Sequence, residues 1–241
     1  MTTRRADRSA IARVVELAVA DEPTAWSAAG FAVESERVRL GATTVRLAGR
    51  HDGRGGVTGW TIAGVADAGR AELDGLPTTF RRNAPADPDP RTAPVHPNGA
   101  AGIDHIVVAT PDLDRTISAF EALQLPCRRV RDAGAGRQQA FFRCGPTIVE
   151  VVGPTRGTAS RSDEPARWFG LALDADDLDR SAELLGGQLG PIKAAVQRGR
   201  RIATLRHHDL HVSVAVALMD DRADAVGPDR PAGPTSPEPG R

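Results

Sequence analysis

The sequence lacks several residue types, and each shortage excludes a class of function. It contains no tyrosine, Lys193 is its only lysine, and 31 basic residues balance 31 acidic ones. Nucleic acids and anionic membranes attract proteins with a strong basic excess. The balanced charge therefore argues against both as partners. No stretch reaches the roughly 20 consecutive apolar residues that a membrane span needs.

Cysteine is also scarce, because Cys127 and Cys144 are the only two. Two isolated thiols are too few for a disulfide framework or a thiolate metal cage, so we expect small, half-buried apolar side chains in a reducing compartment. Arg13 and Glu16 interrupt the apolar run at residues 11–20, which excludes the core of a signal peptide. These features predict a cytoplasmic protein.

Two stretches stand out by composition in this chain of 241 residues. Residues 81–100 are dense in Pro, Asn, Asp and Gly, which predicts an exposed linker. Residues 220–241 have no apolar periodicity and are predicted to be a disordered tail. The informative patterns lie between them, in residues 101–219.

Residues 101–219 contain a duplicated unit. The tetrapeptide Asp-Leu-Asp-Arg begins at Asp112 and again at Asp177, each time after a short apolar strand. A carboxylate there accepts free backbone N–H groups of a first helical turn, so a helix is predicted to begin at each copy. Gly-Arg pairs at 136 and 199 open a second matching pair of segments, each followed by a polar turn and an apolar strand. Each unit, 101–155 and 166–219, is predicted to run β-α-β-β-β.

A fainter copy lies in residues 10–80. Residues 14–21 followed by 24–30 have the strand-then-helix form, and residues 40–49 parallel residues 144–153. Residues 59–76 predict one more strand and helix. The N-terminal part is interpreted as a degenerate relative of the C-terminal pair.

The apolar strand at 147–152 contains one ionisable residue, Glu150. Because side chains alternate along a strand, Ile148, Glu150 and Val152 share one face. An ionised carboxylate on such a strand costs on the order of several kcal/mol unless it is paired. His105, on the first strand of the same unit, is the expected partner.

Histidine and carboxylate side chains ligate Zn, Ni, Mn and non-haem Fe(II). The last strand is predicted to run over residues 211–218, with His211, Ser213 and Ala215 on one face. His211 is therefore a third candidate ligand beside His105 and Glu150, in a set that leaves coordination positions open. The alternative is that His105 hydrogen-bonds Glu150 with no metal at all. The repeat aligns Gly170 with His105 and Ser213 with Glu150, and the N-terminal copy aligns Val14 and Arg46 with them; none of these is a usual ligand.

These motifs resemble the vicinal oxygen chelate (VOC) superfamily, which includes glyoxalase I, the bleomycin-resistance proteins and the extradiol dioxygenases. The resemblance rests on Asp104-His-Ile-Val-Val with Asp112-Leu-Asp, on Gly136-Arg-Gln-Gln-Ala-Phe-Phe, and on Thr147-Ile-Val-Glu-Val-Val. It implies an α+β fold in which tandem βαβββ modules form a cupped mixed sheet with helices outside. It also implies a divalent metal on the floor of the cup, with His105, Glu150 and His211 as its ligands in this chain.

The function that the resemblance implies is a glyoxalase-like one, a metal-assisted isomerase or lyase on a small carbonyl metabolite, or a dioxygenase. If Glu150 is not bound to metal, it is instead a general base whose pKa the apolar cup raises. The alternative is a metal-free protein that sequesters a small molecule, similar to the bleomycin-resistance branch. A structural role, in which the N-terminal module fills the cup, is the third hypothesis. Family members build their cups within one chain or between two, so a homodimer stays open.

Overall fold

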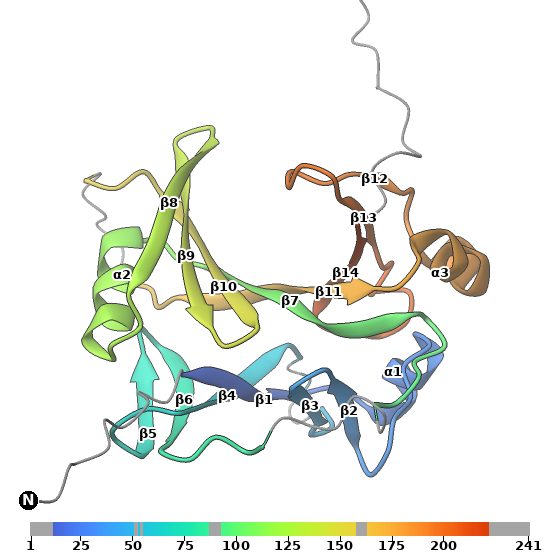
Figure 1. Ribbon diagram of the computed structural model, residues 1–241, viewed down its shortest axis with the longest axis horizontal. Coiled ribbons are helices and arrows are strands. Elements are labelled where there is room, and N and C mark those ends of the chain that lie inside the picture. The colour runs from blue at the N-terminus through green and yellow to red at the C-terminus, as the bar shows by residue number, and fades with distance from the viewer. Residues whose placement is uncertain (1–11, 51–52, 54, 87–92, 158–162, 222–241) are drawn as a thin grey trace, which may run out of the picture.

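The computed structural model describes residues 12–50, 53, 55–86, 93–157 and 163–221. These residues form two mixed β-sheets, one of six strands and one of eight (Figure 1). Residues 222–241 of the predicted tail and residues 87–92 of the predicted linker lie outside the described part of the chain. Within the described part, no helix is long and apolar enough to cross a membrane.

The N-terminal part forms the six-stranded sheet, in the order β2-β3-β1-β4-β6-β5. One helix, α1, follows its first strand. The elements are β1 (Arg13–Val19), α1 (Pro23–Ala28), β2 (Arg37–Leu40), β3 (Thr43–Leu47), β4 (Val57–Ala63), β5 (Gly69–Leu73) and β6 (Leu76–Arg81).

The eight-stranded sheet has the order β12-β13-β14-β11-β7-β10-β9-β8. Its first half comprises β7 (Ala100–Ala109), α2 (Leu113–Ala122), β8 (Cys127–Gly134), β9 (Arg137–Cys144) and β10 (Thr147–Pro154). Its second half comprises β11 (Arg167–Ala175), α3 (Leu178–Leu185), the short 3₁₀ helix η2 (Gly186–Gln188), β12 (Lys193–Ala194), β13 (Arg201–Thr204) and β14 (Ala215–Asp220). The two predicted βαβββ modules are thereby confirmed.

The repeated aspartates cap the two helices of this sheet as predicted. The side chain of Asp112 accepts a hydrogen bond from the backbone N–H of Arg115 at the start of α2. Asp177 accepts from the N–H groups of Asp179 and Arg180 at the start of α3. Each carboxylate satisfies donors that the first helical turn leaves without a partner.

The two modules meet at their first strands, which pair antiparallel in the centre of the sheet. His105 lies opposite Ala172, and Val107 lies opposite Gly170. If His105 is equivalent to Gly170, then Val107 is equivalent to Ala172, and a two-fold axis between the strands exchanges these two pairs. The register therefore agrees with the sequence repeat at this point.

The two sheets pack back to back through one hydrophobic core. Figure 1 shows the eight-stranded sheet curled into a U, with α2 and α3 outside its arms and the six-stranded sheet beneath its floor. Trp60 of β4 contacts Phe120 and Trp168 edge to face, at centroid distances of 6.2 and 6.0 Å. Each sheet consequently has one buried face and one open face.

The helix predicted within residues 59–76 is wrong, because this segment forms β4, β5 and part of β6. Asp74 and Gly75 both have positive φ and form the two-residue loop between β5 and β6, in which Leu73 pairs with Leu76. An Asp-Gly pair between extended segments is a strong hairpin signal. The polar-apolar spacing there belongs to an edge strand with one open face.

The predicted exposed linker is only partly exposed. His96 and Asn98 are 4% and 1% exposed. The His96 ring accepts a hydrogen bond from the backbone N–H of Ala32, and the Asn98 amide donates to the carbonyl oxygen of Ala29. The end of this segment is thus anchored on the residues that follow α1, a contact that composition does not reveal.

Candidate active site

The open face of the eight-stranded sheet forms the cup. On β7, Ile106 and Val108 are fully buried toward the core, whereas His105 and Val107 on the opposite side are partly exposed. The arms of the U rise on either side of this face (Figure 1). The side chains of His105 and Val107 are therefore partly open to solvent, while their neighbours on β7 hold the sheets together.

His105 and Glu150 lie side by side on this face. Strands β7 and β10 pair in parallel, with Ile148 beside His105 and Glu150 beside Val107. The His105 Nε2 atom is 3.9 Å from the Glu150 Oε2 atom. The structure thus brings together the imidazole and the carboxylate that the strand pattern predicts to be partners.

Asp104 joins this pair, although strict alternation would place it on the other face. The register between β7 and β11 shifts here, because Ile103 pairs with Leu173 and His105 with Ala172, which leaves Asp104 as an extra residue. Such a bulge turns two consecutive side chains toward one side. The Asp104 Oδ1 atom lies 2.6 Å from the His105 Nδ1 atom.

Arg200, the residue before β13, holds Asp104 from the second module. One guanidinium nitrogen donates to Asp104 Oδ2 at 2.6 Å and another to Asp174 Oδ1 at 2.7 Å. Burial alone would raise the pKa of Asp104, but hydrogen bonds from His105 and Arg200 outweigh it and leave that pKa below its ordinary value. Asp104 is therefore an ionised, fixed partner of the imidazole.

The environment of Glu150 has the opposite effect on its carboxylate, because Glu150 is buried and its hydrogen-bond donor is a neutral amide. Its residue surface is 9% exposed, and its Oε1 atom accepts a hydrogen bond from Gln139 at 2.6 Å. Gln139 in turn accepts from Arg131 at 2.6 Å. Desolvation raises the pKa of Glu150 against the opposing charges of His105 and Arg131. The second oxygen, Oε2, is left facing His105.

His211 does not join the pair. It lies in the turn before β14, which begins only at Ala215, and it has a positive φ of 57°. It is exposed, and its carbonyl oxygen accepts a hydrogen bond from Arg50 of the N-terminal part. The expectation that residues 211–215 continue the last strand is wrong, so His211 is not directed into the cup by that strand.

The repeat register also corrects the position equivalent to Glu150. Gly170 pairs with Ala215 and Ala172 with Ala217, just as His105 pairs with Ile148 and Val107 with Glu150. The connection before β14 is longer than the connection before β10. The residue of the second module that is equivalent to Glu150 is therefore Ala217 and not Ser213. Position 170 has no room for a metal-ligating side chain, because a Cβ atom there would lie 2.7 Å from the Ala215 carbonyl oxygen.

The donor set does not fit the divalent metal that the resemblance implies. Among the described residues, no group of three or more His, Cys, Asp or Glu side chains is placed to hold a metal ion. His105 and Glu150 are two donors, and the equivalent positions of the second module carry glycine and alanine. Tetrahedral catalytic sites take three protein ligands. What the cup does contain is a buried base beside an imidazole that a carboxylate orients.

The six-stranded sheet repeats this layout with different residues. Leu40 pairs with Thr43 across the β2–β3 turn as Cys144 pairs with Thr147 across the β9–β10 turn. From that anchor, Glu16 pairs with Thr44 at the place where His105 pairs with Ile148. The position of His105 is thus taken by Glu16 and not by Val14, whereas Arg46 matches Glu150 as expected.

No protein-family model matches the sequence, and neither does any curated protein. Solved structures do. The chain is similar to a mutant of 4-hydroxymandelate synthase from Streptomyces coelicolor, with a TM-score of 0.57, 13% identity, and coverage of 89% of this chain and 94% of that chain. It is similar to BphC, a halotolerant catechol dioxygenase, with a TM-score of 0.57, 11% identity and coverage of 86% of each chain.

A third similar structure is a fusion of a xylose isomerase-like TIM barrel with 4-hydroxyphenylpyruvate dioxygenase. It has a TM-score of 0.56 and 16% identity, and the match covers 91% of this chain but 50% of that one. At these identities the likeness concerns the fold. Together with the two βαβββ modules and their curled sheet, it shows that this chain has the fold of the vicinal oxygen chelate superfamily.

Proposed function

We propose that this chain is an isomerase or lyase that moves a proton on a small carbonyl compound bound in the cup, with Glu150 as its general base. The observation that carries the proposal is the buried Glu150 carboxylate, whose pKa burial raises, 3.9 Å from the imidazole of His105. Carboxylates whose pKa is shifted by burial beside a specific partner are often found at functional sites.

The reaction needs only groups that the chain supplies. Glu150 Oε2 removes a proton from the carbon next to the substrate carbonyl, and the electron pair of that C–H bond forms a C=C bond as charge moves onto the carbonyl oxygen. His105 donates a hydrogen bond from Nε2 to that oxygen. For an α-hydroxy ketone, Glu150 returns the proton to the former carbonyl carbon while the hydroxyl proton moves to the other oxygen, which completes an isomerisation with no net oxidation.

The surroundings of both groups suit these roles. A base works best when its pKa lies near the working pH, and desolvation moves that of Glu150 in this direction. Asp104 occupies the Nδ1 side of the ring, which fixes the orientation of the imidazole. Gln139 occupies one oxygen of Glu150 and so fixes the direction of the other.

The proposal assigns no step to a metal, because the donor set of the described residues does not fit one. It also favours catalysis over sequestration. A protein that only holds a small molecule has no use for a buried carboxylate aimed at an imidazole, since burying the charge is costly.

Proton exchange tests this function whatever the product of the reaction is. Wild-type protein is incubated in D₂O with a panel of 2-oxo acids and α-hydroxy ketones, with and without EDTA, and loss of α-proton signals is followed by NMR. We expect protein-dependent exchange that Glu150→Gln lowers by about 100-fold or more. Glu121→Gln, an exposed change on α2, serves as the matched control. Equal exchange by the Glu150→Gln variant contradicts the assignment.

A further inference from the structure

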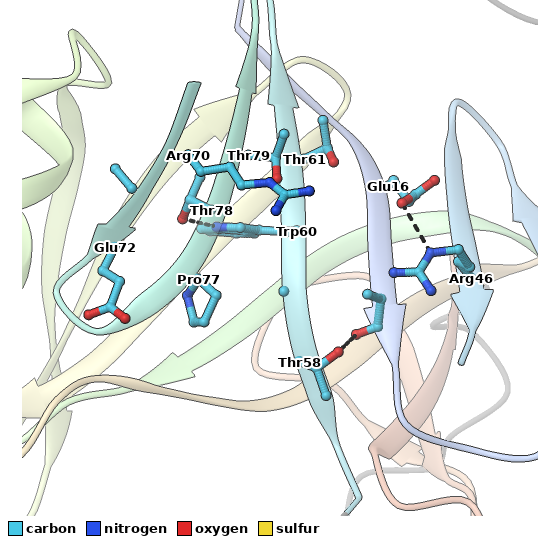
Figure 2. A pocket seen from close by; sticks show the side chains of 13 residues that line it. Glu16, Arg46, Thr58, Trp60, Thr61, Arg70, Glu72, Pro77, Thr78 and Thr79 are labelled. Carbon is cyan, nitrogen blue, oxygen red and sulfur yellow. Dashed lines mark hydrogen bonds and ion pairs between the residues drawn. The ribbon is translucent and has the colours of Figure 1, made fainter. Parts of the chain in front are cut away.

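The six-stranded sheet has a hollow on its own open face. It has a volume of about 500 Å³ and is lined by strands β1, β3, β4, β5 and β6 (Figure 2). This face points away from the core and from the cup of the other sheet. The hollow occupies the same place on its sheet that the cup occupies on the eight-stranded one, and the reaction at Glu150 does not use it.

Two neighbouring rows of side chains form its floor. In one row Glu16 pairs with Thr61, Thr61 with Thr79, and Thr79 with Arg70. In the next row Ala18 pairs with Gly59, and Gly59 lies next to Pro77 on the neighbouring strand β6. The first row is polar, and the second is small and apolar.

The charged residues of the hollow differ in what they contact. The Glu16 carboxylate is already paired, with Arg46 at 3.4 Å and Arg37 at 3.2 Å. Arg70 makes no hydrogen bond or ion pair with any residue in the described part of the chain. Figure 2 shows its guanidinium group extending from β5 across β6 toward Thr61 and Thr79. Glu72, on the rim, points away from that group in the same view.

Thr61 is the second unusual feature. It is 5% exposed and lines the hollow, yet its hydroxyl has no hydrogen-bond partner among the residues that the structure describes. Other buried threonines of this sheet are satisfied: Thr43 donates to the carbonyl oxygen of Val14, and Thr78 donates to that of Leu76. Among the described residues, the fully buried polar atoms without a partner do not include the Thr61 hydroxyl, so this group is open to the hollow and available to hydrogen-bond a ligand.

We propose that this hollow is a second binding site, for a small organic acid. The carboxylate binds the guanidinium of Arg70, which suits bidentate contact, and accepts hydrogen bonds from the hydroxyls of Thr61 and Thr79. The apolar part of the ligand lies over Ala18 and Gly59. An inorganic anion would satisfy the polar row alone and leave most of the 500 Å³ to solvent.

A titration with sodium benzoate, followed by the backbone amide NMR signals of Thr61 and Thr79, tests the site. Sodium chloride holds the ionic strength constant, and benzamide serves as the uncharged analogue. We expect saturable shifts with benzoate and at least about tenfold weaker binding of benzamide. Signals of His105 and Glu150 stay in place, and Glu150→Gln binds benzoate as wild type does, which separates this site from the cup.

Two variants decide which side chains bind the acid. Arg70→Gln weakens benzoate binding at least about tenfold, whereas Arg137→Gln, an exposed arginine on the other sheet, leaves it unchanged. Thr61→Val removes one hydroxyl at nearly constant shape, so it weakens binding while the free energy of unfolding changes little. Equal benzoate affinity in wild type and Arg70→Gln, equal binding of benzamide, or shifts that never saturate overturn the proposal.

Discussion

The carboxylate of Asp21 accepts hydrogen bonds from the backbone N–H of Ser213 through both oxygens, at 3.1 and 3.0 Å. Asp21 follows β1, and Ser213 lies in the turn before β14, so this contact joins the two sheets across 192 residues of chain. Asp21 is fully buried and also accepts from the Trp26 indole at 3.0 Å. The same turn carries His211 away from the cup.

Asp21→Ala is expected to lower the free energy of unfolding by about 3 kcal/mol, because it leaves the buried indole N–H and the Ser213 N–H without acceptors. Urea unfolding measures the change. Asp67→Ala, at an exposed aspartate between β4 and β5, is expected to change the free energy of unfolding little. Similar losses in both variants would show that the contact between Asp21 and Ser213 contributes nothing specific.

Glu150 should make the stability of the protein depend on pH. Its pKa in the folded state is raised above the ordinary value of 4.5, so between these two pKa values the folded state holds more protons than the unfolded state. The free energy of unfolding therefore falls as pH rises through that window. Relative to Glu150→Gln, wild type loses stability from about pH 4.5 upward and reaches a plateau above the folded pKa. Urea unfolding of both proteins from pH 4 to 9 measures the difference, and a difference that does not vary with pH contradicts the raised pKa.

Asp104→Asn should slow the proposed proton transfer while the fold is kept. The amide keeps one acceptor oxygen for Arg200, but its NH2 group cannot accept a hydrogen bond from His105 Nδ1, and the negative charge beside the imidazole is lost. We expect the α-proton exchange rate to fall by about 100-fold. Most of this loss should appear as a lower kcat, with KM changing less. Asp176→Asn, an exposed change, is the control. A loss confined to substrate affinity would assign Asp104 to binding instead.

Metal affinity should be gained by adding a third donor. Ala217→Glu places a carboxylate at the position of the second module equivalent to Glu150 and partly exposed on the open face. With His105 and Glu150 it supplies three ligands, so calorimetry should find tighter Zn²⁺ or Ni²⁺ binding than in wild type. Ala217→Gln is the isosteric control. Wild type that binds Zn²⁺ as tightly as Ala217→Glu would mean that the two native donors already suffice.

The repeat and the residue faces were predictable because they follow from local rules. Alternation along β10 places Glu150 with Ile148 on one side wherever the strand goes, and Asp112 and Asp177 cap helices through neighbouring N–H groups. The two βαβββ modules and the meeting of His105 with Glu150 follow from these rules and the duplicated pattern.

Three features depend on pairing across the sheets and could not be predicted in this way. Asp104 faces the cup because β7 has an extra residue against β11, and His211 leaves it because a longer turn contacts Asp21 and Arg50 of the other sheet. Gly170 is required by the close approach of β14. Alternation and spacing describe one strand at a time, whereas bulges and turn paths are set by what lies beside them.

By itself, then, the sequence determined the duplicated modules, the ends of their helices and the two side chains that share the cup floor. The tertiary structure alone decided that His211 lies outside the cup, that a bulge supplies Asp104 as the partner of the imidazole, and that the other sheet bears a hollow of its own. The physical reason is that local hydrogen bonding and alternation are encoded within a few residues, while register, close backbone approach and burial arise only when distant strands pair.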